Sequence, residues 1–147
     1  MSRRNPWLIA GGFLSAAAAL LHIGVIIGGA DWYRYFGAGE QMARMAEAGS
    51  PIPALITLGI ALVLAVWAAY AFAGAGLVRR LPLMRTALIA ITSIYLLRGL
   101  MIIPVLLQPT PAGFDLWSSL IVLAYGAAYA LGTIRAWPSL SNKESFA

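Results

Sequence analysis

The sequence predicts an all-α integral membrane protein, built as a bundle of four transmembrane helices. Hydrophobic residues make up 61% of the 147 residues, charged residues make up only 10%, and the mean hydropathy is +0.84. A soluble domain has roughly 25% charged residues. Because lipid offers the backbone no hydrogen bonds, apolar segments of this kind must form helices. We expect one transmembrane domain over residues 1–147.

Four apolar segments are long enough to cross the roughly 30 Å hydrocarbon core of a bilayer. The predicted spans are about 7–29, 53–78, 86–107 and 116–134. The length of the first run favours a retained span over a cleaved signal peptide. Small residues recur at four-residue spacing, which lets helix backbones approach closely in lipid. They are Gly12 with Ala16, Gly24 with Gly28, Ala61 through Ala73, and Ala124 through Gly132. We interpret these residues mainly as packing within the bundle.

The first external loop is predicted to contain a short amphipathic helix over residues 38–48. Glu40, Arg44 and Glu47 share one face at three- and four-residue spacing, while Met42 lies on the other. The segment Gly49-Ser50-Pro51 ends the helix. Such a helix lies on the membrane surface or folds over the mouth of the bundle.

The distribution of charge predicts that both termini lie in the cytoplasm of a bacterial cell. Basic residues flank the span ends on one side of the bundle, and acidic residues are in excess on the other, as the positive-inside rule requires. The flanking basic residues are Arg3, Arg4, Arg79, Arg80, Arg85, Arg135 and Lys143. They explain the net charge of +5 without a nucleic-acid partner. We therefore expect a protein of the bacterial inner membrane that contacts membrane lipid.

Arg98 is the most informative residue, because it interrupts the third apolar span with a full charge. An arginine at membrane depth costs about 2.5–3.5 kcal/mol on insertion scales. His22, the only histidine, lies in the first span at a similar height. At about 1.5 Å per residue, both lie roughly 20 Å above the cytoplasmic ends of their helices. We expect a polar pocket in the outer half of the bundle.

The side chains of this pocket are expected to take distinct roles. Arg98 supplies a fixed cation that can form paired hydrogen bonds with carboxylate or phosphate. His22 is the group that titrates near neutral pH. Tyr95, one turn before Arg98, and Tyr125 of the fourth span are the hydroxyl donors. Asp31 or Glu40 from the external loop supplies the counter-charge.

The leading functional hypothesis is a protein that binds, processes or carries a small anionic or lipid-like ligand. A first alternative is an accessory or scaffold subunit of a membrane complex, in which Arg98 is a strut that pairs with Asp31 or Glu40. A second is a small-molecule transporter that works as a dimer, since one bundle leaves little room for a path. Whether any reaction is catalysed stays open.

The residue types exclude several kinds of chemistry. The absence of cysteine excludes disulfides, thiol redox reactions and thiolate metal ligands. One histidine and scattered methionines do not form a metal-ligand set, so no metal site is expected. No phosphate-binding loop or other cofactor motif is present, so no cofactor is expected.

Overall fold

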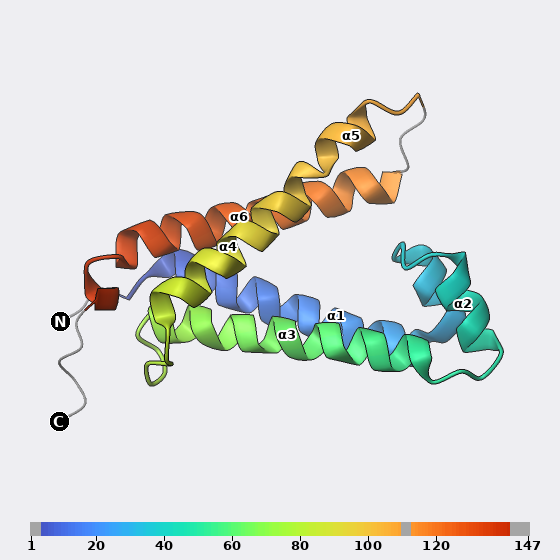
Figure 1. The fold of residues 1–147 in the computed structure, drawn as a ribbon, viewed down its shortest axis with the longest axis horizontal. Helices are drawn as coiled ribbons and strands as arrows, with labels where there is room; N and C mark the ends of the chain where they lie inside the picture. Colours follow the sequence, from blue (N-terminus) through green and yellow to red (C-terminus); the bar gives the residue numbers. More distant parts are fainter. Residues whose placement is uncertain (1–3, 110–112, 142–147) are drawn as a thin grey trace. The chain divides into compact units, whose positions relative to one another are not determined.

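The computed structural model describes residues 4–109 and 113–141, and these residues form helices joined by short turns (Figure 1). The elements are α1 (Pro6–Tyr35), α2 (Glu40–Glu47), α3 (Ile52–Gly74), α4 (Met84–Leu100), α5 (Ile102–Leu106), α6 (Gly113–Ala136) and a 3₁₀ turn, η1 (Ser139–Ser141). Four segments are long and apolar enough to cross a membrane, namely α1, α3, α4 with α5, and α6. The prediction of an all-helical membrane protein with four spans is confirmed at this level.

The described residues form two compact units. Unit 1 contains residues 4–14, 67–109 and 113–141, and unit 2 contains residues 15–66. Both α1 and α3 run from one unit into the other. Each unit is described by itself below.

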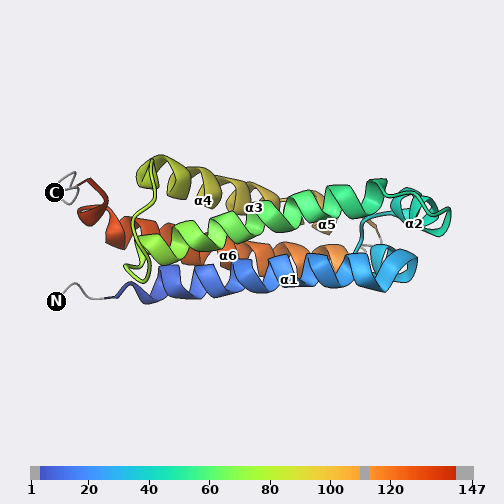
Figure 2. The same cartoon turned by 90° about the horizontal axis from the view of Figure 1, so that it is seen from below.

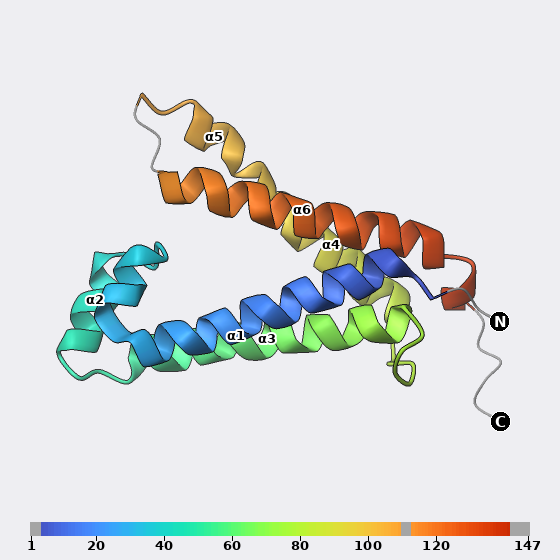
Figure 3. The ribbon, with the colours of Figure 1, turned by 180° about the vertical axis from the view of Figure 1, so that it is seen from behind.

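Unit 1 is built around the antiparallel pair α4 and α6, which lie side by side (Figure 3). The first turns of α1 and the last turns of α3 belong to the same unit. Leu8 of α1 is fully buried, and a Cβ on Gly132 of α6 or Gly74 of α3 would come within 2.8 Å of its side chain. Gly12 packs in the same way against the ring of Phe72. The predicted role of small residues in internal packing is therefore confirmed at Gly12 and Gly132.

Two reciprocal glycine contacts set the distance between α4 and α6. A Cβ on Gly99 of α4 would lie 2.8 Å from Cα of Leu123. A Cβ on Gly126 of α6 would lie 2.7 Å from the side chain of Leu96 and 3.1 Å from its backbone nitrogen. Each helix thus presents a glycine to a leucine of its partner, and this allows the two backbones to approach closely.

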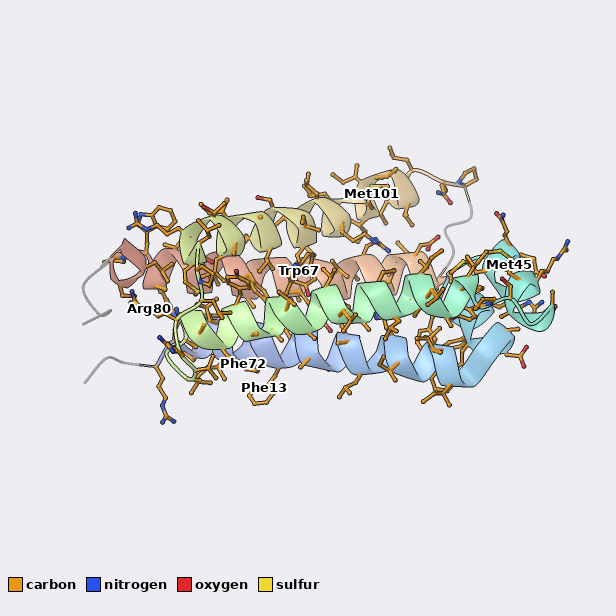
Figure 4. The ribbon with its side chains drawn as sticks, turned by 60° about the horizontal axis from the view of Figure 1, so that its bottom comes forward. Phe13, Met45, Trp67, Phe72, Arg80 and Met101 are labelled. Atoms are coloured by element: carbon orange, nitrogen blue, oxygen red, sulfur yellow. The ribbon has the colours of Figure 1, made fainter. Side chains whose placement is uncertain are left out.

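The third span is interrupted at Met101, between α4 and α5 (Figure 4). Pro104 has no N–H, so it cannot donate to the carbonyl of Leu100 as a continuous helix requires. The chain tightens one turn earlier instead, where the Met101 N–H donates to the carbonyl of Arg98 over 3.3 Å. Pro104 accounts for the break, which leaves Arg98 in the last turn of α4.

Unit 2 contains the parts of α1 and α3 from residues 15–35 and 52–66, which lie side by side (Figures 1 and 2). Gly29 kinks α1 at φ 68° and ψ −149°, a conformation that is essentially restricted to glycine. Beyond the kink, α2 packs back on the end of α1, where buried Tyr33 and Ala43 form a small core. Met42 packs against this core. The helix α2 lies within the stretch 38–48.

Candidate functional site

Arg98 lies on the exposed edge of the α4–α6 pair, and its partners are two neutral hydroxyls. Its Nη1 donates to Ser119 Oγ over 3.3 Å and its Nη2 to Ser118 Oγ over 3.5 Å. Both bonds are longer than the usual 2.7–3.2 Å. Ser119 is buried, whereas the residue Arg98 is exposed. The guanidinium group is therefore anchored to α6 by weak hydrogen bonds and is accessible.

Within the described part of unit 1, no carboxylate neutralises Arg98. Asp115, in the first turn of α6, is the one carboxylate in the described part of this unit. Its backbone carbonyl accepts a hydrogen bond from Ser118 Oγ over 3.3 Å, but its side chain forms no ion pair with Arg98. A guanidinium has five N–H donors, so the two serine hydroxyls leave donor capacity unused.

Tyr95 and Tyr125 lie together in an aromatic cluster of unit 1. The ring of Tyr95 contacts the rings of Tyr125, Tyr129 and Trp67, with centroids 5.4, 5.3 and 4.9 Å apart. Tyr129 is fully buried and donates from its hydroxyl to the carbonyl of Trp67 over 3.0 Å. The cluster joins α3, α4 and α6 one turn from Arg98, so it fixes the helix that carries the cation.

His22 lies in unit 2 and is half-buried on α1. Its Nδ1 is 2.7 Å from the carbonyl of Ala18, one turn earlier. A carbonyl only accepts hydrogen bonds, so Nδ1 must have the proton. Nε2 is then the ring atom that accepts a hydrogen bond in the neutral form.

Asp31 and Glu40 also belong to unit 2, where they meet around Arg34. The Arg34 guanidinium lies 2.9 Å from Glu40, 2.8 Å from Glu47 and 3.5 Å from Asp31. Glu40 in addition accepts a hydrogen bond from Arg44 over 3.1 Å, as its four-residue spacing predicts. This network ties α2 to the end of α1, and both predicted counter-charges take part in it.

Hydrogen bonds from Arg34, and then from Arg44, lower the pKa of Glu40 from 4.5 to about 2. A carboxyl whose folded-state pKa is lowered adds stability above its unfolded value, and this stability is lost as the pH falls through the folded value. We therefore expect α2 to loosen as the pH falls from 4.5 to about 2. The measurement is the hydrogen-exchange protection of the buried Ala43 amide. In Glu40→Gln that protection should depend less on pH, and an unchanged pH dependence would contradict the assignment.

The structure thus distributes the six predicted site residues between its two units. Arg98, Tyr95 and Tyr125 belong to unit 1, and the other three belong to unit 2. Sequence reasoning missed Ser119, which lies next to Ser118 on α6. The Ser-Ser pair is the signal that would have indicated it. Arg34 was missed as the centre of the acidic cluster because its partners are up to thirteen residues away.

Comparison of the chain with protein-family models, with curated proteins and with solved structures finds no match. The function must therefore be argued from the residues themselves.

Proposed function

We propose that this chain is a small binding protein of the bacterial inner membrane that holds the anionic group of a small or lipid-like ligand against Arg98. The observation that carries the proposal is the guanidinium group in the third span, whose partners in unit 1 are two serine hydroxyls at 3.3 and 3.5 Å. An intramembrane cation without a carboxylate partner is expensive. A bound carboxylate or phosphate offsets this cost by forming paired, charge-assisted hydrogen bonds.

The position of Arg98 along its span supports a ligand with an amphipathic character. Arg98 lies fourteen residues after Met84 and eight before Leu106, the ends of the apolar segment. At about 1.5 Å per residue, the Cα is roughly 12 Å from the nearer end. A long arginine side chain extends from this depth toward the interface, where lipid headgroups lie.

The pairing of the loop carboxylates argues against a purely structural Arg98. Glu40 is engaged by two arginines, and Asp31 lies beside Arg34 with its side chain 94% exposed. Neither acid needs Arg98 as its partner. The ligand-binding role therefore explains the charge in the span better than a strut to these acids.

The distribution of arginines in unit 1 supports an orientation with both termini in the cytoplasm and with α2 on the external side. Arg80 contacts the carbonyl of Ser139, Arg85 lies over the ring of Trp137 and Arg135 lies over the ring of Trp7. These contacts gather the basic residues at the end of unit 1 where α1 begins and α6 ends. In an inner membrane, such an end faces the cytoplasm.

The test compares Arg98→Lys with wild type for binding of an anionic lipid. The full chain in detergent is titrated with phosphatidylglycerol, and bound lipid is counted by native mass spectrometry. We expect Arg98→Lys to fold but to bind about tenfold more weakly, since lysine keeps the charge and loses the paired hydrogen bonds.

The matched control is Arg79→Lys, an arginine outside the spans that is exposed. It should bind as wild type does. Equal affinity of Arg98→Lys and wild type would contradict the proposal, provided that far-UV circular dichroism shows both to be folded. A free short-chain carboxylate, such as octanoate, serves as a second probe and separates a soluble anion from a phospholipid.

A further inference from the structure

A groove with hydroxyl groups in its walls lies between α4 and α6, entirely within unit 1. Its volume of about 400 Å³ falls within the range of about 300–1,000 Å³ that is typical of ligand sites. The walls contain Ile89, Thr92 and Ser93 of α4 and Ala130, Thr133 and Ile134 of α6. All the described residues that line the groove are neutral, so it suits a ligand without charge.

The groove is open along its apolar edge. The side chains of Ile89 and Ile134 are 47% and 70% exposed, and both lie within helices that are long and apolar enough to cross a membrane. In a bilayer this edge meets the hydrocarbon core. A ligand of the groove therefore enters from the membrane and must be soluble in lipid.

Thr133 brings a hydroxyl that lacks a partner to the groove. The residue is 6% exposed, and its buried Oγ1 has no hydrogen-bond partner among the described residues. A buried hydroxyl is costly without a hydrogen bond, so Thr133 is suited to an acceptor from outside the chain. Threonine in a helix populates two χ1 rotamers, which exchange its hydroxyl and its methyl group. The hydroxyl can therefore turn toward an acceptor that occupies the groove.

Ser93 supplies a second hydroxyl, deeper along the groove. The depth is counted from the contact between Arg85 and Trp137, where Arg85 Nη2 donates to the Trp137 carbonyl over 3.1 Å. Thr133 lies four residues before Trp137, and Ser93 lies eight residues after Arg85. At about 1.5 Å per residue, the two hydroxyls lie roughly 6 and 12 Å from this contact, and so roughly 6 Å apart along the helices.

We propose that the groove binds the ring of a quinone-type ligand, a neutral and lipid-soluble molecule with carbonyl oxygens at opposite ends of one ring. Two C=O bonds of about 1.23 Å across a six-membered ring place the oxygens roughly 5 Å apart, close to the spacing of the hydroxyls. Ser93 and Thr133 each donate to one carbonyl. The ester carbonyls of a phospholipid lie in one layer near the interface, so they match the depth of Thr133 but not that of Ser93.

Trp137 supplies an aromatic surface at the shallow end of the groove. It lines the groove, and the guanidinium of Arg85 lies 4.4 Å from the centroid of its ring. This contact and the hydrogen bond to the Trp137 carbonyl hold the residue in place. Aromatic rings favour offset-stacked and edge-to-face contacts with one another, and a quinone ring offers a flat partner.

The experiment measures the quenching of tryptophan fluorescence by decylubiquinone, titrated into the full chain in detergent. We expect saturable quenching, because a bound quinone lies next to Trp137. Ser93→Ala and Thr133→Val should each weaken the affinity about fivefold, since each removes one hydrogen bond. Thr92→Val is the matched control, because the Thr92 hydroxyl already donates to the carbonyl of Leu88 over 2.6 Å. It should change the affinity less than twofold.

The melting temperature without ligand separates a binding role of Thr133 from a structural one. Thr133→Val keeps the shape of the side chain and removes an unpartnered hydroxyl, so it should melt no lower than wild type. Ala130→Leu fills the groove and should abolish saturable quenching. Ala127→Leu is its control on the same helix, because Ala127 is exposed and does not line the groove. If Ala130→Leu does not fold, Thr133→Val decides the test.

Three results would overturn the proposal. Equal quenching of wild type and folded Ala130→Leu would show that the quinone acts only from the detergent micelle. Full displacement by phosphatidylcholine would assign the groove to a phospholipid ester. A dimer in native mass spectrometry that is lost in Ala130→Leu, without quinone binding to wild type, would assign it to a second copy of the chain. Arg98→Lys should leave the quenching unchanged, so the result does not depend on the function proposed for Arg98.

Discussion

Gly99→Val is expected to destabilise unit 1 by about 3 kcal/mol, at the upper end for overpacking. A Cβ at this position would lie 2.8 Å from Cα of Leu123, and backbone cannot move aside as a flexible side chain does. The two helices must therefore separate. Separation also draws Arg98 away from its hydrogen-bond partners Ser118 and Ser119, so binding of phosphatidylglycerol at Arg98 should weaken together with stability.

The matched control is Gly59→Val in α3, where a Cβ would meet nothing within 4 Å. Its melting temperature in detergent should stay close to that of wild type, because valine and glycine differ little in a helix with open surroundings. A Gly99→Val protein as stable as Gly59→Val would show that α4 and α6 lie farther apart than the 2.8 Å between a Cβ on Gly99 and Cα of Leu123 implies. Gly126→Val, on the other helix of the contact, should behave as Gly99→Val does.

The number of membrane spans could be predicted from the sequence because it depends only on the length of the apolar runs. Their boundaries were less predictable. The second span was expected to reach residue 78, but α3 ends at Gly74. The residues that follow are apolar yet form the turn around Gly76, so hydropathy does not reveal the end of the helix. The first span was expected to end at Gly29, where the structure instead has a kink and the helix continues to Tyr35.

The faces that helices present to one another were harder to predict. The buried face of α4 contains Leu88, Ile91, Tyr95 and Gly99, whereas the sequence suggested that Tyr95 and Arg98 share one pocket. In water, polar residues mark the outer face of a helix. In lipid both faces are apolar, and association depends on close packing of small residues. Gly99 and Gly126 provide that packing, and Gly99 has no small residue four positions before or after it.

The residues of the candidate site were identified by their cost in lipid rather than by a motif. The cost of a charge in lipid indicated Arg98, and the positions of Tyr95 and Tyr125 in their spans indicated these two residues. The structure brings all three into one unit. The cost in lipid could not indicate partners, because a hydrogen-bond partner depends on the register between helices. Ser119 and Arg34 illustrate this limit, since each becomes prominent only through contacts with residues on another helix or beyond a turn.

Arg98→Leu is expected to abolish binding of phosphatidylglycerol at that site, and removal of an acid should not compensate. If Arg98 paired with Glu40 or Asp31, replacing both residues of the pair would recover most of the stability lost in Arg98→Leu alone. A lone buried charge costs about 3–5 kcal/mol, whereas removing the whole pair is often neutral. Because Glu40 pairs with Arg34 and Arg44 instead, we expect no such recovery of stability. The melting temperatures of Arg98→Leu with Glu40→Gln, and of Arg98→Leu with Asp31→Asn, should equal the sum of the single shifts.

A positive control for this additivity test exists within unit 2. Arg34 and Glu40 are in direct contact at 2.9 Å, so Arg34→Leu with Glu40→Gln should deviate measurably from the sum of its single variants. If the stability shifts of Arg34→Leu and Glu40→Gln are coupled while those of Arg98→Leu and the acid variants simply add, the charge in the third span is assigned to a ligand. Recovery of stability in either double variant with Arg98→Leu would instead make Arg98 a structural strut and remove the basis of the proposed binding site.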